Sequence, residues 1–81
     1  MTREEAYGRL DKVFQDVFDD ESIHVTDATT SDDIEDWDSF EHINLIVAVE
    51  KEFGIKFSMG QTNKLKNVGE MVDIILEKLK Q

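Results

Sequence analysis

Apolar residues recur at spacings of three and four near both ends of the chain. In the first stretch, residues 3–18, the apolar positions are Ala6, Tyr7, Leu10, Val13, Phe14, Val17 and Phe18. In the last stretch, residues 68–80, they are Val68, Met71, Val72, Ile75, Leu76 and Leu79. This spacing places each set on one face of a helix, so both stretches are predicted to be amphipathic helices. Thr2 is a suitable N-cap for the first helix, with Glu5 as its capping-box partner.

Residues 39–53 predict a third long helix, with a broader apolar surface than one stripe requires. Its apolar positions are Phe40, Ile43, Leu45, Ile46, Val47, Val49 and Phe53. The helix is therefore either buried on two sides or carries an exposed contact patch. Asp38 or Ser39 can supply the N-cap, and Asp38 with Glu41 would form a capping box. Gly54 is expected to end the helix.

The segments between these helices are predicted to be loops with little regular structure. Residues 20–38 form a long loop with a short helical turn around 31–35, held by Ile23 and Val25, and Trp37 is expected to pack it against the helices. Residues 55–67 form a connector with a brief helix around 61–66. The sequence therefore predicts an all-α fold in one domain, residues 1–81. It is a small four-helix bundle with three main helices, one short third helix and a long loop between helices one and two.

Charge and composition exclude several classes of function. The chain of 81 residues has 9 basic and 19 acidic residues, for a net charge of −10. Residues 13–50 contain no Lys or Arg, and their acidic residues are densest at 32–38. This charge argues against binding nucleic acid or an anionic membrane surface, and it favours steering of basic partner proteins. There is no apolar stretch long enough for a membrane span, so we expect a cytoplasmic monomer.

Two kinds of chemistry are excluded by residue type and spacing. The chain has no Cys, which excludes disulfides, thiolate metal sites and a cysteine nucleophile. Residues 27–38 have the length of an EF-hand loop, but Asp32 and Asp38 replace the Gly and Glu that such a loop requires, so no metal site is predicted. Ser39 and His42 are three residues apart on one helix face. With no oxyanion-hole signature beside them, we predict no catalytic residue and no enzyme activity.

Residues 36–43 and 47–55 closely resemble the acyl carrier protein family, and the resemblance extends over nearly the whole chain. In that family an Asp-Ser-Leu motif opens the second helix, and its serine accepts 4'-phosphopantetheine. Asp38 and Ser39 match the motif, with Phe40 in place of the commoner Leu.

The resemblance implies a function and a set of partners. The chain would carry acyl intermediates as thioesters on a 4'-phosphopantetheine arm, which a phosphopantetheinyl transferase moves from coenzyme A onto Ser39, next to Asp38. It would present them to acyl-transferring and acyl-modifying enzymes with basic docking patches. The implied docking residues are the charged Glu41 and Glu50 and the apolar Ile43 and Val47.

Alternatives and departures from the family remain. An aminoacyl, D-alanyl or peptidyl carrier has the same fold, and a small acidic helical adaptor would use Ser39 only as a helix cap. Fatty acid synthesis, a polyketide route and modification of a surface polysaccharide are all open as pathways. Positions that are often acidic in the family are Asn44, Lys51, Gly60 and Asn63 here, which argues against docking through the third helix. The family's usual Pro is Ser58 here, which predicts a looser connector.

Overall fold

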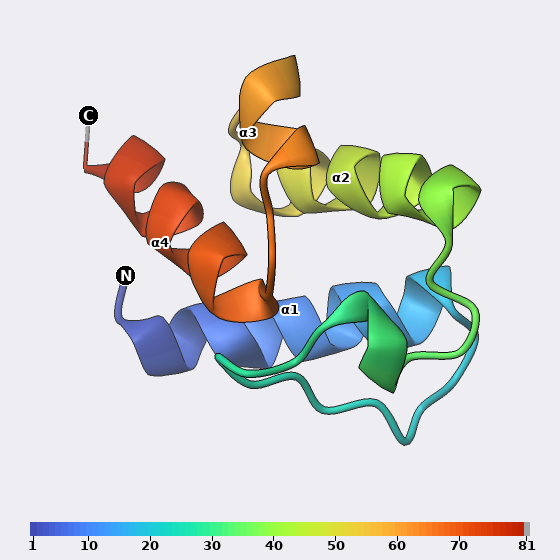
Figure 1. The fold of residues 1–81 in the computed structure, drawn as a ribbon. Helices are drawn as coiled ribbons and strands as arrows, with labels where there is room; N and C mark the ends of the chain where they lie inside the picture. Colours follow the sequence, from blue (N-terminus) through green and yellow to red (C-terminus); the bar gives the residue numbers. More distant parts are fainter. Residues whose placement is uncertain (81) are drawn as a thin grey trace.

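The computed structural model describes residues 1–80, and within that range every regular element is a helix and there is no strand (Figure 1). Its elements are α1 (Arg3–Val17), the 3-10 turn η1 (Ser31–Asp33), α2 (Ser39–Phe53), α3 (Met59–Asn63) and α4 (Val68–Leu79). The predicted all-α fold with a short third helix is confirmed. The predicted helical turn within the long loop is confirmed by η1.

Local capping interactions set where α1 begins and where α2 ends. The Thr2 hydroxyl accepts a hydrogen bond from the Glu5 backbone N–H at 3.2 Å, and the Glu5 carboxylate accepts one from the Thr2 N–H at 2.9 Å, as predicted. Gly54 ends α2 in the left-handed conformation with φ of 68°, which costs glycine little because it has no Cβ. These two ends were readable from the sequence because capping uses residues close to each other in the chain.

Two predicted details at helix starts are wrong. Asp38 caps α2 by accepting a hydrogen bond from the Glu41 N–H at 2.8 Å, but the Glu41 carboxylate accepts from the Asn44 amide instead of completing a capping box. Helix α3 begins at residue 59 rather than 61. The reason is that Ser58 and Gln61 form a capping box there, which ties the connector down instead of loosening it.

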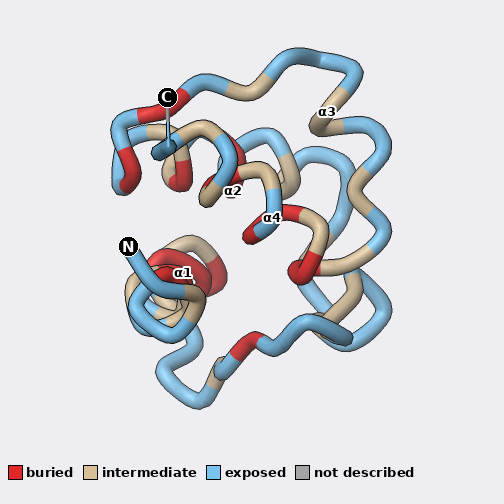
Figure 2. Tube along the Cα trace, turned by 90° about the vertical axis from the view of Figure 1, so that its left-hand side faces the viewer, coloured by how far each residue is buried: buried red, intermediate tan, exposed pale blue. Residues whose placement is uncertain are grey.

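Helix α1 is the central element of the core and packs against both α2 and α4. In Figure 2 the buried parts of α1, α2 and α4 face the space between these helices, while most of the long loop is exposed. The largest fully buried side chains come from all three helices: Leu10, Phe14, Leu45, Val49, Val68, Met71, Val72 and Ile75. Burial of these apolar side chains is the main force that holds the three helices together.

Asp27 anchors the middle of the long loop to the two terminal helices. Its carboxylate accepts a hydrogen bond from Arg3 at 2.7 Å and another from the Tyr7 hydroxyl of α1. Its carbonyl oxygen accepts from the Gly69 N–H of α4 at 3.1 Å. A Cβ on Gly69 would lie 2.9 Å from that carbonyl oxygen, so the close approach requires glycine. The loop therefore turns back to the start of α4, as its course in Figure 1 shows.

Trp37 fastens the end of the same loop to α1. Its ring meets Phe14 edge to face with centroids 5.4 Å apart, and it lies 6.3 Å from the Phe18 ring. The predicted packing of Trp37 against the helices is confirmed. Val25 is buried and Ile23 half-buried against the core, so the predicted apolar anchors of the loop are confirmed as well.

The tyrosine in this anchor gives a pH-dependent test. Burial raises the pKa of Tyr7 to about 12, and its hydrogen bond to Asp27 contributes to the rise. Since tyrosine in an unfolded chain has a pKa of about 10, the contribution of Tyr7 to stability is fully present below pH ~10. That contribution is lost as the pH rises toward the folded pKa. The chain has one tyrosine, so the ultraviolet absorbance of tyrosinate reports on Tyr7 alone. We expect a titration midpoint near 12.

Asp27→Asn should lower this midpoint toward 10, because it removes the negative charge that opposes ionisation of the phenol. Asp73→Asn is the matched control, since Asp73 pairs with Arg3 at 2.7 Å. Its midpoint should stay close to that of the wild type. A wild-type midpoint near 10 would contradict the anchoring role of Tyr7.

Candidate functional site

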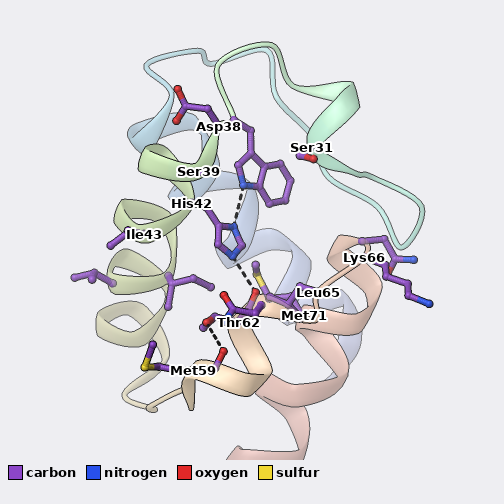
Figure 3. Close-up of a pocket in the computed structure, with 15 residues that line it drawn as sticks. Ser31, Asp38, Ser39, His42, Ile43, Met59, Thr62, Leu65, Lys66 and Met71 are labelled. Carbon is purple, nitrogen blue, oxygen red and sulfur yellow. Dashed lines mark hydrogen bonds between the residues drawn. The ribbon is translucent and has the colours of Figure 1, made fainter.

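Ser39 is the first residue of α2 and follows the long acidic loop directly. Its side chain is exposed, and its hydroxyl makes no hydrogen bond within residues 1–80. The adjacent Asp38 uses its carboxylate to cap the helix, which fixes the backbone on both sides of the hydroxyl. The structure thus presents a free serine oxygen at a defined helix N-terminus, at the upper end of α2 in Figure 3.

A cavity of about 700 Å³ opens beside Ser39, between α2, α3 and the start of α4. Its walls combine apolar and hydrogen-bonding side chains in nearly equal number. The lining residues are Ser31, Trp37, Asp38, Ser39, His42, Ile43, Ile46, Val47, Met59, Thr62, Asn63, Leu65, Lys66, Asn67 and Met71. A flexible group attached to the Ser39 oxygen would therefore have space and mixed polarity next to it.

His42 stands in this cavity and connects three segments of the chain. Its Nδ1 accepts a hydrogen bond from the Trp37 indole N–H at 3.1 Å, and its Nε2 lies 3.1 Å from the Thr62 carbonyl oxygen of α3. The Trp37 and His42 rings are stacked with an interplanar angle of 16°. Both ring nitrogens have partners other than Ser39, so His42 is not placed to act as a general base on the Ser39 hydroxyl. The sequence does not indicate that His42 links Trp37 to Thr62.

One side of α2 carries large apolar side chains that point into solvent. Phe40 is 72% exposed, Ile43 64% and Val47 44%, and Met59 of α3 is 81% exposed. We call these four residues the apolar rim. The broad apolar pattern of residues 39–53 is thus explained by a surface patch in addition to the core face, one of the two possibilities that the sequence left open. The place of Phe40 in this patch is predictable from the sequence, because it lies three residues before Ile43, which lies four before Val47. No sequence pattern indicates that Met59 belongs to the patch.

The predicted acidic docking residues lie in different surroundings. Glu41 is half-buried near Ser39 and accepts a hydrogen bond from Asn44 at 3.0 Å. Glu50 lies near the other end of α2, where its carboxylate accepts a hydrogen bond from the Phe57 N–H at 2.8 Å. Glu50 therefore holds the α2–α3 connector in place, and a docking role for it remains a prediction.

The start of α2 favours a negatively charged group on Ser39. A phosphate on Ser39 would lie at the positive end of the dipole of a 15-residue helix. Among the described residues, no group of three or more His, Cys, Asp or Glu side chains could hold a metal ion.

Within residues 1–80, no helix has the length and apolar character needed to cross a membrane.

Two known proteins are similar to this chain over most of its length. An acyl carrier protein of Petrotoga mobilis (strain DSM 10674 / SJ95) is 34% identical over 80 residues, which make up 98% of this chain and 93% of that protein. The solution NMR structure of a holo acyl carrier protein from Geobacter metallireducens matches with a TM-score of 0.86 and 45% identity. That match covers 93% of this chain and 86% of the other. No protein-family model matches the chain.

Proposed function

The chain belongs to the acyl carrier protein family, and from that premise we propose that Ser39 is the residue to which its 4'-phosphopantetheine arm is attached. Members of this family carry acyl groups as thioesters on that covalent arm. The observation that supports Ser39 is its exposed, unpaired hydroxyl at the N-terminus of α2, beside the cavity. The surrounding Asp38-Ser39-Phe40 sequence agrees with the attachment motif of the family.

The chain must obtain its thiol from outside, because it has no cysteine. In the proposed modification, the Ser39 oxygen forms a bond to the phosphorus that carries the pantetheine group of coenzyme A. The pyrophosphate bond of coenzyme A breaks, 3',5'-adenosine diphosphate leaves, and the hydroxyl proton passes to a base of the transferase. The transferase also supplies Mg²⁺. Because the base and the metal ion both belong to the transferase, Ser39 is a modification site and the chain itself performs no catalysis.

Residues near Ser39 would position the modified group and keep it mobile. Asp38 fixes the first turn of α2 through its bond to the Glu41 N–H, and the helix dipole favours a phosphate at that end. The exposed carboxylates of Glu35, Asp36 and Asp38 repel a phosphodiester. This balance favours an arm that extends into solvent, which suits a group that visits several active sites.

We further propose that partner enzymes dock on the α2 residues of the apolar rim, with Ile43 and Val47 at the centre of the contact and Glu41 beside it. Enzymes with basic patches match the acidic segment 13–50, which has no Lys or Arg of its own. This negative charge also agrees with our proposal that the chain is a cytoplasmic monomer and binds no nucleic acid. The phosphopantetheinyl transferase is the first such partner, since it must reach Ser39.

The first prediction from the proposed function concerns the attachment residue. Intact mass is measured after incubation with coenzyme A, Mg²⁺ and a broad-specificity phosphopantetheinyl transferase. We expect the wild-type chain to gain one phosphopantetheinyl group and Ser39→Ala to gain none, because the acceptor oxygen is gone. Ser31→Ala, which removes another cavity-lining hydroxyl, is the matched control and should be modified like the wild type. Unmodified wild-type protein beside an active transferase would favour the adaptor interpretation.

The second prediction concerns docking. Val47→Asp should lower kcat/KM for the modification of Ser39 by about tenfold, the factor expected for the loss of one apolar contact at an interface. The matched control is Leu79→Asp on α4, since Leu79 is 38% exposed and lies on another helix. Equal rates for Val47→Asp and the wild type would show that the transferase does not use the apolar rim.

A further inference from the structure

We propose that Trp37, His42 and Thr62 form a hydrogen-bonded bar across the cavity beside Ser39, and that this bar selects short or polar acyl cargo by closing the cavity's inner end to alkyl chains. The proposal rests on the proposed function, because it concerns the cargo carried at Ser39. It makes His42 a specificity-determining residue.

The bar lies between two differently lined parts of the cavity. In the view of Figure 3, His42 and Thr62 stand between Ile43 and Met59 on one side and Leu65 and Met71 on the other. Ile43 and Met59 are largely exposed, whereas Met71 is 1% exposed and Leu65 packs against the core. An alkyl chain that moved from the outer part to the inner part would have to pass the His42 ring.

Hydrogen-bonding chemistry allows one form of His42 in this bar. The Trp37 indole nitrogen can only donate, so Nδ1 of His42 must be the unprotonated acceptor. The Thr62 carbonyl oxygen can only accept, so Nε2 must carry the proton. The neutral Nε2–H tautomer satisfies both partners at once. This assignment gives the bar a spectroscopic signature that does not depend on cargo.

The bar is also held at its far end. Trp37 packs edge to face against Phe14 of α1, and Phe14 is fully buried. Parting His42 from its partners would leave an indole N–H and a carbonyl oxygen without hydrogen bonds in a half-buried place, and an alkyl chain offers neither a donor nor an acceptor to replace them. A cargo with hydroxyl, carbonyl or amide groups can instead bond to polar side chains that line the cavity, such as Ser31, Asn63 and Asn67.

The first test uses the unmodified protein. The ¹⁵N chemical shifts of the His42 imidazole should report the neutral Nε2–H tautomer, and exchange of the Trp37 indole proton with solvent should be several-fold slower in the wild type than in His42→Ala. Free decanoyl pantetheine should bind His42→Ala about tenfold more tightly than the wild type, a factor within the combined net strength of the two hydrogen bonds that His42 makes. Trp37→Phe, which keeps an aromatic ring but removes the donor, should show an intermediate gain. Asn44→Ala on the same helix is the matched control and should bind like the wild type.

The second test uses protein loaded at Ser39 with a butyryl or a decanoyl group, with loading verified by intact mass. In the wild type, nuclear Overhauser contacts of the decanoyl chain should be confined to the apolar rim. In His42→Ala they should extend to the methyl groups of Leu65 and Met71. Contacts from the decanoyl chain to Leu65 and Met71 in the wild type, with the His42 imidazole shifts unchanged, would overturn the proposal. So would equal binding of free decanoyl pantetheine to the wild type and His42→Ala. A failure of the proposed function would appear separately, as an absence of loading in the mass spectrum.

Discussion

The edge-to-face contact between Trp37 and Phe14 is the interaction on which the site depends. It ends the long loop at a fixed point on α1, with ring centroids 5.4 Å apart, so that the next two residues can cap and begin α2. Asp38 then closes the first turn, and Ser39 is left exposed at the helix N-terminus. The same indole donates to His42 and so influences the cavity wall as well. One aromatic side chain therefore positions both the candidate attachment residue and the space beside it.

Helix α2 serves the core and the surface with different faces. Leu45, Val49 and Phe53 are buried against the other helices, while Phe40, Ile43 and Val47 are exposed next to Ser39. Exposed apolar side chains in a small acidic domain carry a cost in solubility, which the charge of −10 offsets by repulsion between copies of the chain. An apolar strip bordered by acids is suited to brief contacts with partners whose own surface is apolar and basic.

Features that depend on neighbours in the sequence could be predicted, and features that depend on tertiary contacts could not. The Thr2 cap, the end of α2 at Gly54 and the position of Ser39 all follow from residues within four positions of each other. The predicted start of α3 at residue 61 is two residues too late, because Ser58 and Gln61 form a capping box that begins the helix at Met59. The anchor between Asp27, Tyr7 and Gly69 joins positions far apart in the chain, and no periodicity in the sequence reports such a contact.

The candidate site divides in the same way. Ser39 and Asp38 could be named as candidates because a local motif carries them. The apolar pattern of α2 left two possibilities open, and the exposure of Ile43 and Val47 was implied by the resemblance to the family. The role of His42 depends on Thr62, twenty positions further on, through a bond from the imidazole to a backbone carbonyl. A backbone partner leaves no trace in residue type, so only the fold could show this bridge.

Peptide mapping by tandem mass spectrometry tests the central claim most directly. The chain is produced together with a phosphopantetheinyl transferase, digested, and searched for the phosphopantetheinyl group on each serine. The account predicts the group on the peptide that contains Ser39, with fragments that place it on that residue. A modified Ser22, Ser31 or Ser58 with an unmodified Ser39 would contradict it.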